Sequence, residues 1–269
     1  MNLLRLITAR GGKAYDPNAN AFFTAAGITD PTQKDAVNQL VLDLKGYGIW
    51  SKMTALYPFV GNTQSTCSYN LVNPAQYQIS FTLGTGSFSA SGWVQGTNSG
   101  TAGYADTNLN PYALGMSTGN IHVSYYTNSP DQTQTGAQDF GINASNAANT
   151  WWLSICANFG GLGILAASTG TPYFTNYAGN GVGFYIATAS GGKLYGIKNT
   201  TTYLNNSITS GSYPSNLSNV YLGCRAIFFD GKSKSRWAFA SVGQGLTQAE
   251  ASNLYTAVQA FQTTLGRQV

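Results

Sequence analysis

The chain has 269 residues, enough for one large domain that buries about three quarters of its unfolded surface. Only 8% of its residues are charged, against about 25% in ordinary globular proteins, and Gly, Tyr and small polar residues take their place. The net charge of +4 is small and scattered, which argues against a nucleic-acid partner, and no run approaches the ~18 apolar residues of a membrane span. This composition is typical of extracellular β proteins and unlike that of cytosolic enzymes.

The first twenty residues are predicted to form an N-terminal arm that is either flexible or docked into a neighbouring subunit. An exposed run of Leu and Ile needs a partner, which favours docking, whereas an unpartnered chain end frays. The residues of this docking arm are Leu3, Leu4, Arg5, Leu6, Ile7 and Arg10. Its apolar run is interrupted by Arg5 and is too short for a secretory signal, so synthesis in a cytoplasm is expected.

Residues 21–269 are predicted to form a single domain that begins with a helical lead-in over residues 21–59. A helical turn is expected over residues 21–27. Asp30-Pro31 then starts a longer helix, because Pro suits the first helical position, and Gly46 ends it. The apolar face of this helix consists of Ala36, Val37, Leu40, Val41 and Leu44.

Strands are predicted between residues 60 and 243, at the turn-separated spacing of a sandwich or barrel. The clearest pair is a hairpin of residues 183–189 and 193–198, because Gly191-Gly192 supplies the positive φ of a tight turn. A polar connection is expected over residues 199–219. The other predicted strands cover residues 76–83, 121–127, 150–158, 220–224, 226–231 and 236–242.

A closing helix is predicted over residues 246–266. Thr247 and Glu250 form a capping box at its start, and Gly266 suits its end. Its apolar stripe consists of Leu254, Val258, Phe261 and Leu265. An antiparallel sandwich has to cover this stripe, so the fold class is mainly β with an N-terminal helical segment and a C-terminal helix.

The order of these elements resembles the closing part of concanavalin A-like (laminin G-like) jelly-roll domains. More narrowly, the chain is similar to a family of structural proteins of tailed-bacteriophage virions. The stretches that carry this resemblance are residues 15–17, 21–30, 48–52, 57–61, 103–107, 109–111 and 249–267. Members of that family carry His-Lys near the position of Cys67-Ser68, so a role of that basic pair does not transfer to this chain.

The sequence is poor in groups that transfer protons, which argues against an enzyme. Glycosidases need two carboxyl groups, yet the nine acidic residues comprise a single Glu, Glu250, and eight dispersed Asp. The one histidine, His122, has no Gly-x-Ser-x-Gly motif to act with and is expected to be structural or on the surface. Three widely spaced cysteines form neither a disulfide framework nor a zinc site.

Glycan binding is the sharpest functional hypothesis, because sugar sites combine aromatic faces with Asp and Asn groups. The candidate residues are Trp93, Tyr104, Asp106, Asn108 and Tyr126. The alternative is that residues 103–107 form a structural turn in which the Tyr packs and the Asp caps. No cofactor or metal is expected, although Asp106 is the best single candidate for a calcium ligand.

The sequence therefore predicts a non-enzymatic virion structural protein on the head or tail surface of a phage, anchored by its arm. Stabilisation, decoration or adhesion would be its role, with other virion proteins, further copies of the chain and bacterial surface glycans as partners. It would be made in the cytoplasm of the host bacterium. The alternatives are a lectin-like carbohydrate-binding module and, third, a degenerate glycoside hydrolase.

Overall fold

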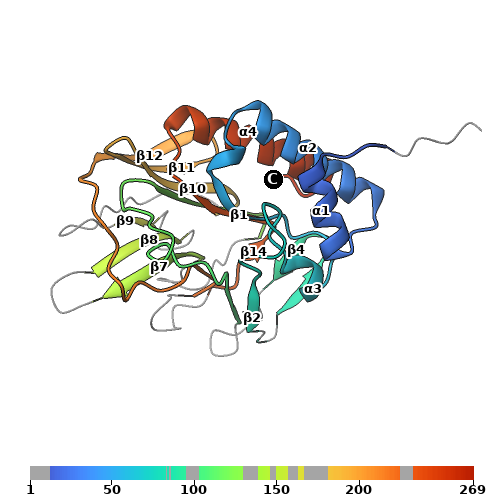
Figure 1. Cartoon of the computed structure of the whole chain (residues 1–269), viewed down its shortest axis with the longest axis horizontal. Coiled ribbons are helices and arrows are strands. Elements are labelled where there is room, and N and C mark those ends of the chain that lie inside the picture. Colours follow the sequence, from blue (N-terminus) through green and yellow to red (C-terminus); the bar gives the residue numbers. More distant parts are fainter. Residues whose placement is uncertain are drawn as a thin grey trace, which may run out of the picture.

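The computed structural model describes residues 13–82, 84, 86–94, 103–129, 139–145, 150–156, 163–166, 181–224 and 233–269. Three layers are stacked in this part of the chain: helices, a six-stranded sheet called sheet A, and a six-stranded sheet called sheet B (Figure 1). A further three-stranded sheet is called sheet C. The predicted docking arm, with Leu3, Leu4, Arg5, Leu6, Ile7 and Arg10, and the predicted strand over residues 226–231 lie outside the described residues.

Sheet A is antiparallel, with the strand order β1-β15-β6-β10-β11-β12. Its strands are β1 (Met53–Tyr57), β15 (Phe239–Gly243), β6 (Ile121–Thr127), β10 (Gly183–Ser190), β11 (Lys193–Lys198) and β12 (Thr201–Ser207). The predicted hairpin of β10 and β11 is confirmed, and Gly191 and Gly192 have φ of 59° and 75° at its turn. Every residue of β6 is buried, so both faces of the sheet centre are covered.

Sheet B is also antiparallel, with the strand order β2-β5-β13-β7-β8-β9. Its strands are β2 (Ser80–Thr82), β5 (Tyr104–Asp106), β13 (Tyr221–Leu222), β7 (Phe140–Ser145), β8 (Thr150–Cys156) and β9 (Gly163–Ala166). Sheet C consists of β14 (Arg236–Trp237), β4 (Gly92–Val94) and β3 (Ser87–Ser89). Two six-stranded antiparallel sheets make the chain a β-sandwich, as predicted.

Aromatic rings form the centre of the core between the sheets. Tyr125 of β6 and Tyr185 of β10 stack with ring centroids 5.4 Å apart, and Trp237 of β14 lies 6.2 Å from Tyr125. Trp93 of β4 continues this column, 4.7 Å from Trp237. Because large aromatic rings contribute much of a core's apolar burial, this column joins sheet C to the sandwich.

Three helices cover the outer face of sheet A, as Figure 1 shows for α4 and α2. They are α1 (Pro17–Ala26), α2 (Pro31–Gly46) and α4 (Gln248–Thr264). The ring centroid of Phe239 in β15 lies 5.8 Å from that of Phe184 in β10 and 6.3 Å from that of Phe261 in α4. The apolar stripe of α4 therefore faces the sheet. A short helix, α3 (Gln64–Cys67), and one 3₁₀ turn, η1 (Trp50–Lys52), complete the helical elements of the described residues.

Helix starts follow the predicted capping chemistry. Asp30 accepts a hydrogen bond from the Gln33 N–H (2.8 Å) at the start of α2, and Pro31 occupies the first helical position. The five predicted apolar residues of α2 are all buried. The turn expected over residues 21–27 is a ten-residue helix that begins at Pro17, inside the range assigned to the arm, because Asp16 caps it.

Three sequence expectations about strands were wrong. β1 lies inside the range assigned to the helical lead-in, because residues 53–57 fill the edge of sheet A beside β15. β12 occupies a stretch expected to be a polar connection, since an exposed edge strand tolerates polar residues. The strand expected over residues 76–83 is reduced to β2, because Tyr77 has a left-handed φ of 54° that interrupts it.

Arg267, just after α4, joins the helical layer to the sheet. Its side chain is 5% exposed and donates hydrogen bonds to the Phe59, Pro58 and Ala238 carbonyls at 3.0, 3.2 and 3.1 Å. Its Nε donates to Gln262 Oε1 at 2.9 Å. Burial lowers the pKa of this guanidinium to about 10, so it stays charged at neutral pH.

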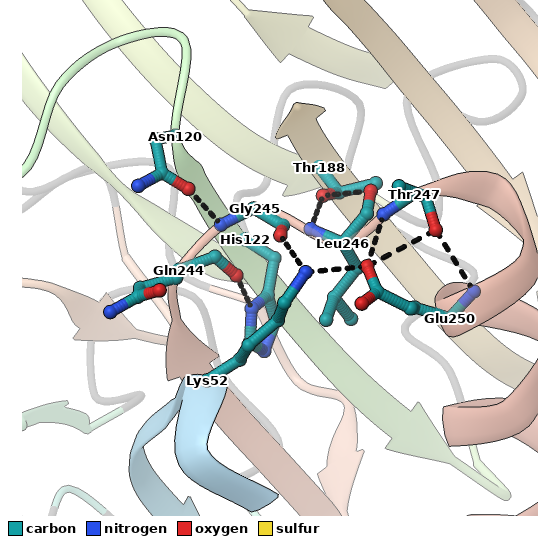
Figure 2. A network of polar contacts seen from close by, with 9 residues as sticks. All are labelled: Lys52, Asn120, His122, Thr188, Gln244, Gly245, Leu246, Thr247 and Glu250. Carbon is teal, nitrogen blue, oxygen red and sulfur yellow. Dashed lines mark hydrogen bonds and ion pairs between the residues drawn. The ribbon is translucent and has the colours of Figure 1, made fainter. Parts of the chain in front are cut away.

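A polar network lies where β15 turns into α4 (Figure 2). The fully buried His122 donates from Nδ1 to the Gln244 carbonyl (2.6 Å), so its Nε2 accepts from Ser241 Oγ (3.0 Å) in the neutral ring. On the same junction, Lys52 Nζ pairs with Glu250 Oε2 at 2.6 Å, and Glu250 forms the predicted capping box with Thr247. The histidine is therefore structural and buried, which decides between the two roles that the sequence left open.

Lowering the pH from 7.5 to 5 is expected to reduce the free energy of unfolding by about 2 kcal/mol through His122 alone. Burial lowers its pKa to about 4, against about 6.5 in the unfolded chain. The unfolded state therefore binds more protons as the pH falls from 6.5 to 4, and stability is lost across that window. Urea unfolding at pH 7.5, 6 and 5 measures this loss.

Two features separate the contribution of His122 to the pH dependence from that of the charged groups beside it. Lys52 and Glu250, the charged groups near His122, oppose each other in their influence on its pKa. Burial alone would raise the pKa of Glu250, but Lys52 holds it below its usual value, so this carboxylate titrates below the tested range. The variant His122→Gln should show no such loss between pH 7.5 and 5; an equal loss in the variant would contradict the assignment.

Replacing Arg267 with Met is expected to cost about 3 kcal/mol of unfolding free energy, because the Phe59 and Pro58 carbonyls and Gln262 Oε1 would lose this donor. The Ala238 carbonyl would keep its hydrogen bond from Gln262 Nε2. Urea unfolding of Arg267→Met gives the value. Lys193→Met is the matched control at a hairpin turn and should change stability by less than about 0.5 kcal/mol. A loss below about 1 kcal/mol in Arg267→Met would show that the hydrogen bonds of Arg267 contribute little to stability.

Candidate functional site

A cluster of aromatic and polar side chains lies on the outer face of sheet B, on strands β2, β5 and β13. Ala105 and Leu222 are fully buried in the sandwich core, so their neighbours Tyr104, Asp106 and Tyr221 point to the opposite face. Asp106 is paired with Ser80 of β2 on one side and with Tyr221 of β13 on the other. Strand pairing therefore brings together side chains that lie up to 141 positions apart in the sequence (80 to 221).

Two tyrosine rings form the apolar part of this cluster. Tyr104 and Tyr221 are both partly buried, with ring centroids 6.0 Å apart and an angle of 51° between the planes. The residue opposite Tyr221 on β7 is Gly141, which has no side chain to lie beside that ring. Burial, and after it the Asp106 carboxylate, raises the pKa of the Tyr221 hydroxyl well above its usual value, so this group stays protonated.

Amide groups hold the Asp106 carboxylate in place. Asn219 Nδ2 donates to both of its oxygens at 3.1 Å, and the Asn108 backbone N–H donates to Oδ1 at 2.7 Å. Asn108 has a left-handed φ of 54°, which Asn tolerates. Its side-chain Nδ2 donates to the Gln78 carbonyl (2.7 Å) and to Ser80 Oγ (2.9 Å).

We call this cluster the tyrosine platform. Its residues are Ser80, Tyr104, Asp106, Asn108, Asn219 and Tyr221. The platform offers ring surface beside a carboxylate and several amide and hydroxyl groups. Such a combination suits a sugar, whose C–H face packs on an aromatic ring while its hydroxyls bond polar groups.

Two of the five predicted glycan-binding residues lie elsewhere. Trp93 is fully buried between Phe81, Phe88 and Trp237, so no face of its ring is accessible to a ligand. Tyr126 is fully buried on the other face of sheet A, under the helices, where its hydroxyl accepts from the Val269 N–H at 2.8 Å. The proposal that these two rings bind a sugar was wrong, because both complete the packing of a core.

Tyr104, Asp106 and Asn108 do lie together, and the structure adds two residues that sequence reasoning missed. Tyr221 belongs to the predicted strand over residues 220–224, so its outward direction was readable from the buried Leu222 beside it, whereas Asn219 ends the stretch predicted as a polar connection. Their partner strand was not readable, because β5 and β13 pair across more than a hundred residues. The structural alternative for residues 103–107 is correct for Asp106, which accepts a hydrogen bond from the Asn108 N–H, but residues 104–106 form strand β5 and not a turn.

The other chemical groups of the described residues provide little basis for a catalytic or metal site. His122 and the hydroxyl of Ser241 that it contacts are fully buried, away from any substrate. Within the same residues, no three His, Cys, Asp or Glu side chains gather closely enough to hold a metal ion. The helices of that part of the chain are too short or too polar to cross a membrane.

Comparison with solved structures identifies the class of fold. The chain is similar to domain 4 of an extracellular arabinanase from Geobacillus stearothermophilus, solved with arabinotriose: TM-score 0.54 and 17% identity, covering 76% of this chain and 98% of that domain. It is similar to a botulinum neurotoxin type C structure, described as depending on two ganglioside molecules for cell entry: TM-score 0.53, 13% identity, 79% of this chain and 52% of that one.

A third similar structure is the Trypanosoma rangeli sialidase in complex with sialic acid, with a TM-score of 0.54 and 10% identity over 76% of this chain and 33% of that one. The chain thus spans one arabinanase domain but only half or a third of the other two proteins. No protein-family model and no curated protein matches the sequence, so the resemblance to phage virion proteins gains no support. The chain has a concanavalin A-like, lectin-like β-sandwich fold, which confirms the predicted fold class.

Calcium is expected to leave the protein unchanged. Both oxygens of Asp106, the predicted calcium candidate, already accept hydrogen bonds from N–H groups, which a cation would have to displace. The melting temperature in millimolar CaCl₂ should therefore equal that in EDTA within about 1 °C, since only a ligand that binds the folded state raises it. A rise of about 5 °C or more that Asp106→Asn abolishes would instead establish a calcium site.

Proposed function

We propose that this chain is a non-enzymatic carbohydrate-binding module, with its ligand on the tyrosine platform. The observation that carries the proposal is the pairing of two partly buried tyrosine rings with a carboxylate that amides hold in place. The outer face of sheet A is occupied by helices, which leaves the outer face of sheet B for a ligand. A shallow, preformed and mostly uncharged surface suits weak and selective sugar recognition.

Hydrolysis is not part of the proposal. Glycosidases place an acid and a second carboxyl group on either side of the bond they cleave, whereas Asp106 is the one carboxylate among the six residues of the platform. Asp106 accepts hydrogen bonds from Asn219 Nδ2 and from the Asn108 N–H, and its oxygens can also accept them from sugar hydroxyls. The platform is therefore proposed to hold a sugar without reacting with it.

The similar solved structures support this class of ligand at the level of their own descriptions, which name arabinotriose, gangliosides and sialic acid. They share only the fold with this chain, so the platform itself carries the argument. Attachment to a phage virion through the N-terminal arm, and association of copies, stay predictions from the sequence. A sugar-binding module on a virion surface would be compatible with both.

The substitution Tyr221→Ala is expected to weaken binding to the best glycan at least about tenfold, a loss of about 1.4 kcal/mol, because it removes one stacking surface. Tyr221→Phe keeps the ring and should retain most of the affinity. A bacterial and plant glycan array followed by calorimetry on the best ligand measures both.

The matched control is Tyr112→Ala, which removes a tyrosine that is 46% exposed but lies in the turn over residues 111–115, outside the platform. Its affinity should equal that of the unaltered chain. Silence across the whole array, or full binding by a folded Tyr221→Ala variant, would reject the proposed function.

A further inference from the structure

A groove adjoins the tyrosine platform on the far side of strand β2. Its volume is about 430 Å³, and it runs between α3 and β2. The residues that line it are Gln64, Ser65, Ser68, Ile79, Ser80 and Phe81. Ser80 belongs to both surfaces, because its hydroxyl also accepts the hydrogen bond from Asn108 of the platform.

The walls of this groove are held in place by a hydrogen bond and by aromatic packing within the protein. The Ile79 N–H donates to the Ser68 carbonyl at 2.8 Å, which joins the end of α3 to the start of β2. The ring of Phe81 is fixed edge-on against Phe88 and Trp93, with centroids 5.0 and 5.1 Å away. A ligand would therefore meet a preformed surface and would not have to order it.

The groove repeats the chemistry of the platform. Phe81 of β2 and Ile79 just before it point toward the core, since Phe81 is paired with Ala105, and at this edge of sheet B they give the groove an apolar floor. The hydroxyl and amide groups of the other lining residues are polar but uncharged. A sugar unit could place its C–H face against Phe81 while its hydroxyls reach Ser65 and Gln64, which are exposed.

We infer that the bound carbohydrate is a neutral oligosaccharide that extends from Tyr221 across Asp106 and Ser80 into the groove beside α3. This inference rests on the proposed function and adds the class of ligand. Tyr221, Asp106 and Ser80 lie opposite one another on three adjacent strands, which spans about 10 Å at ~4.8 Å per strand. That span, with the groove beyond it, exceeds a single sugar ring.

The charge of the residues in the platform and the groove favours a neutral sugar over an acidic one. Among the residues of the platform and the groove, the one charged group is the Asp106 carboxylate. A sialic or uronic acid would bring a second negative charge beside it, and no Lys or Arg belongs to either set of residues. Like charges at short distance discriminate against such ligands.

The dependence of affinity on the length of the oligosaccharide tests the inference. Affinities would be measured by calorimetry for arabino-, cello-, malto- and xylo-oligosaccharides of one to six units, with sialyllactose and oligogalacturonate as acidic probes. The affinity for the preferred neutral series should rise at least tenfold from its shortest to its longest member. The acidic probes should bind more weakly than neutral sugars of equal length.

The substitution Ser65→Trp places a large side chain in the groove at an exposed position of α3. It should remove the gain with chain length while leaving the affinity for the shortest ligands unchanged. The matched control is Ser252→Trp, at an exposed position in a separate groove of about 350 Å³ between β12 and α4, and should keep the full gain.

The outcomes separate the two proposals. If no sugar binds, the proposed function fails and the inference fails with it. If sugars bind through Tyr221 but affinity is independent of chain length, or if Ser65→Trp keeps the gain, the function stands and the extended ligand is wrong. Stronger binding of the acidic probes would overturn the assignment of a neutral ligand.

Discussion

The packing of α4 and α2 on the outer face of sheet A is the interaction on which the rest of the structure depends. Phe239 and Phe184 would expose aromatic surface if Phe261 and its neighbours did not cover them. Burial of this face supplies hydrophobic stabilisation, and Arg267 fixes the end of α4 by bonding three carbonyls of the sheet side. Covering sheet A in this way makes its central strand β6 a buried strand on both faces. Among the described residues, the apolar cluster of α1, α2 and α4 includes residues of sheet A and none of sheet B.

The candidate site follows from that asymmetry. On sheet B, the residues that point inward complete the aromatic core, and those that point outward on β5 and β13 are two tyrosines and an aspartate. The surface is preformed, because Asn219 and Asn108 hold Asp106 while Trp93 supports Phe81 from within. The buried aromatic residues thus act indirectly, as supports for the side chains that can meet a ligand.

Local signals in the sequence predict the elements whose chemistry is local. The Asp30-Pro31 start of α2, the capping box of α4 and the Gly191-Gly192 turn are all as predicted, because each depends on neighbouring residues. Tyr77 breaks an alternating strand pattern with a left-handed φ, which the pattern itself does not encode. The site was predictable only in part, because Tyr104, Asp106 and Asn108 are close in sequence whereas Tyr221 and Asn219 reach them through long-range pairing of β5 and β13. Trp93 and Tyr126 were expected to bind a ligand because the sequence pattern of a strand does not show which of its faces other elements cover. In the structure both side chains are fully buried.

Hydrogen–deuterium exchange with and without the best-binding oligosaccharide tests the central claim most directly, because it locates the ligand without altering the chain. The account predicts slower amide exchange over residues 78–82, 104–108 and 219–222, and unchanged exchange in the helices that cover sheet A. Protection confined to residues 199–202 and 248–252, beside the groove between β12 and α4, would contradict it and place the ligand on the helical side of the molecule.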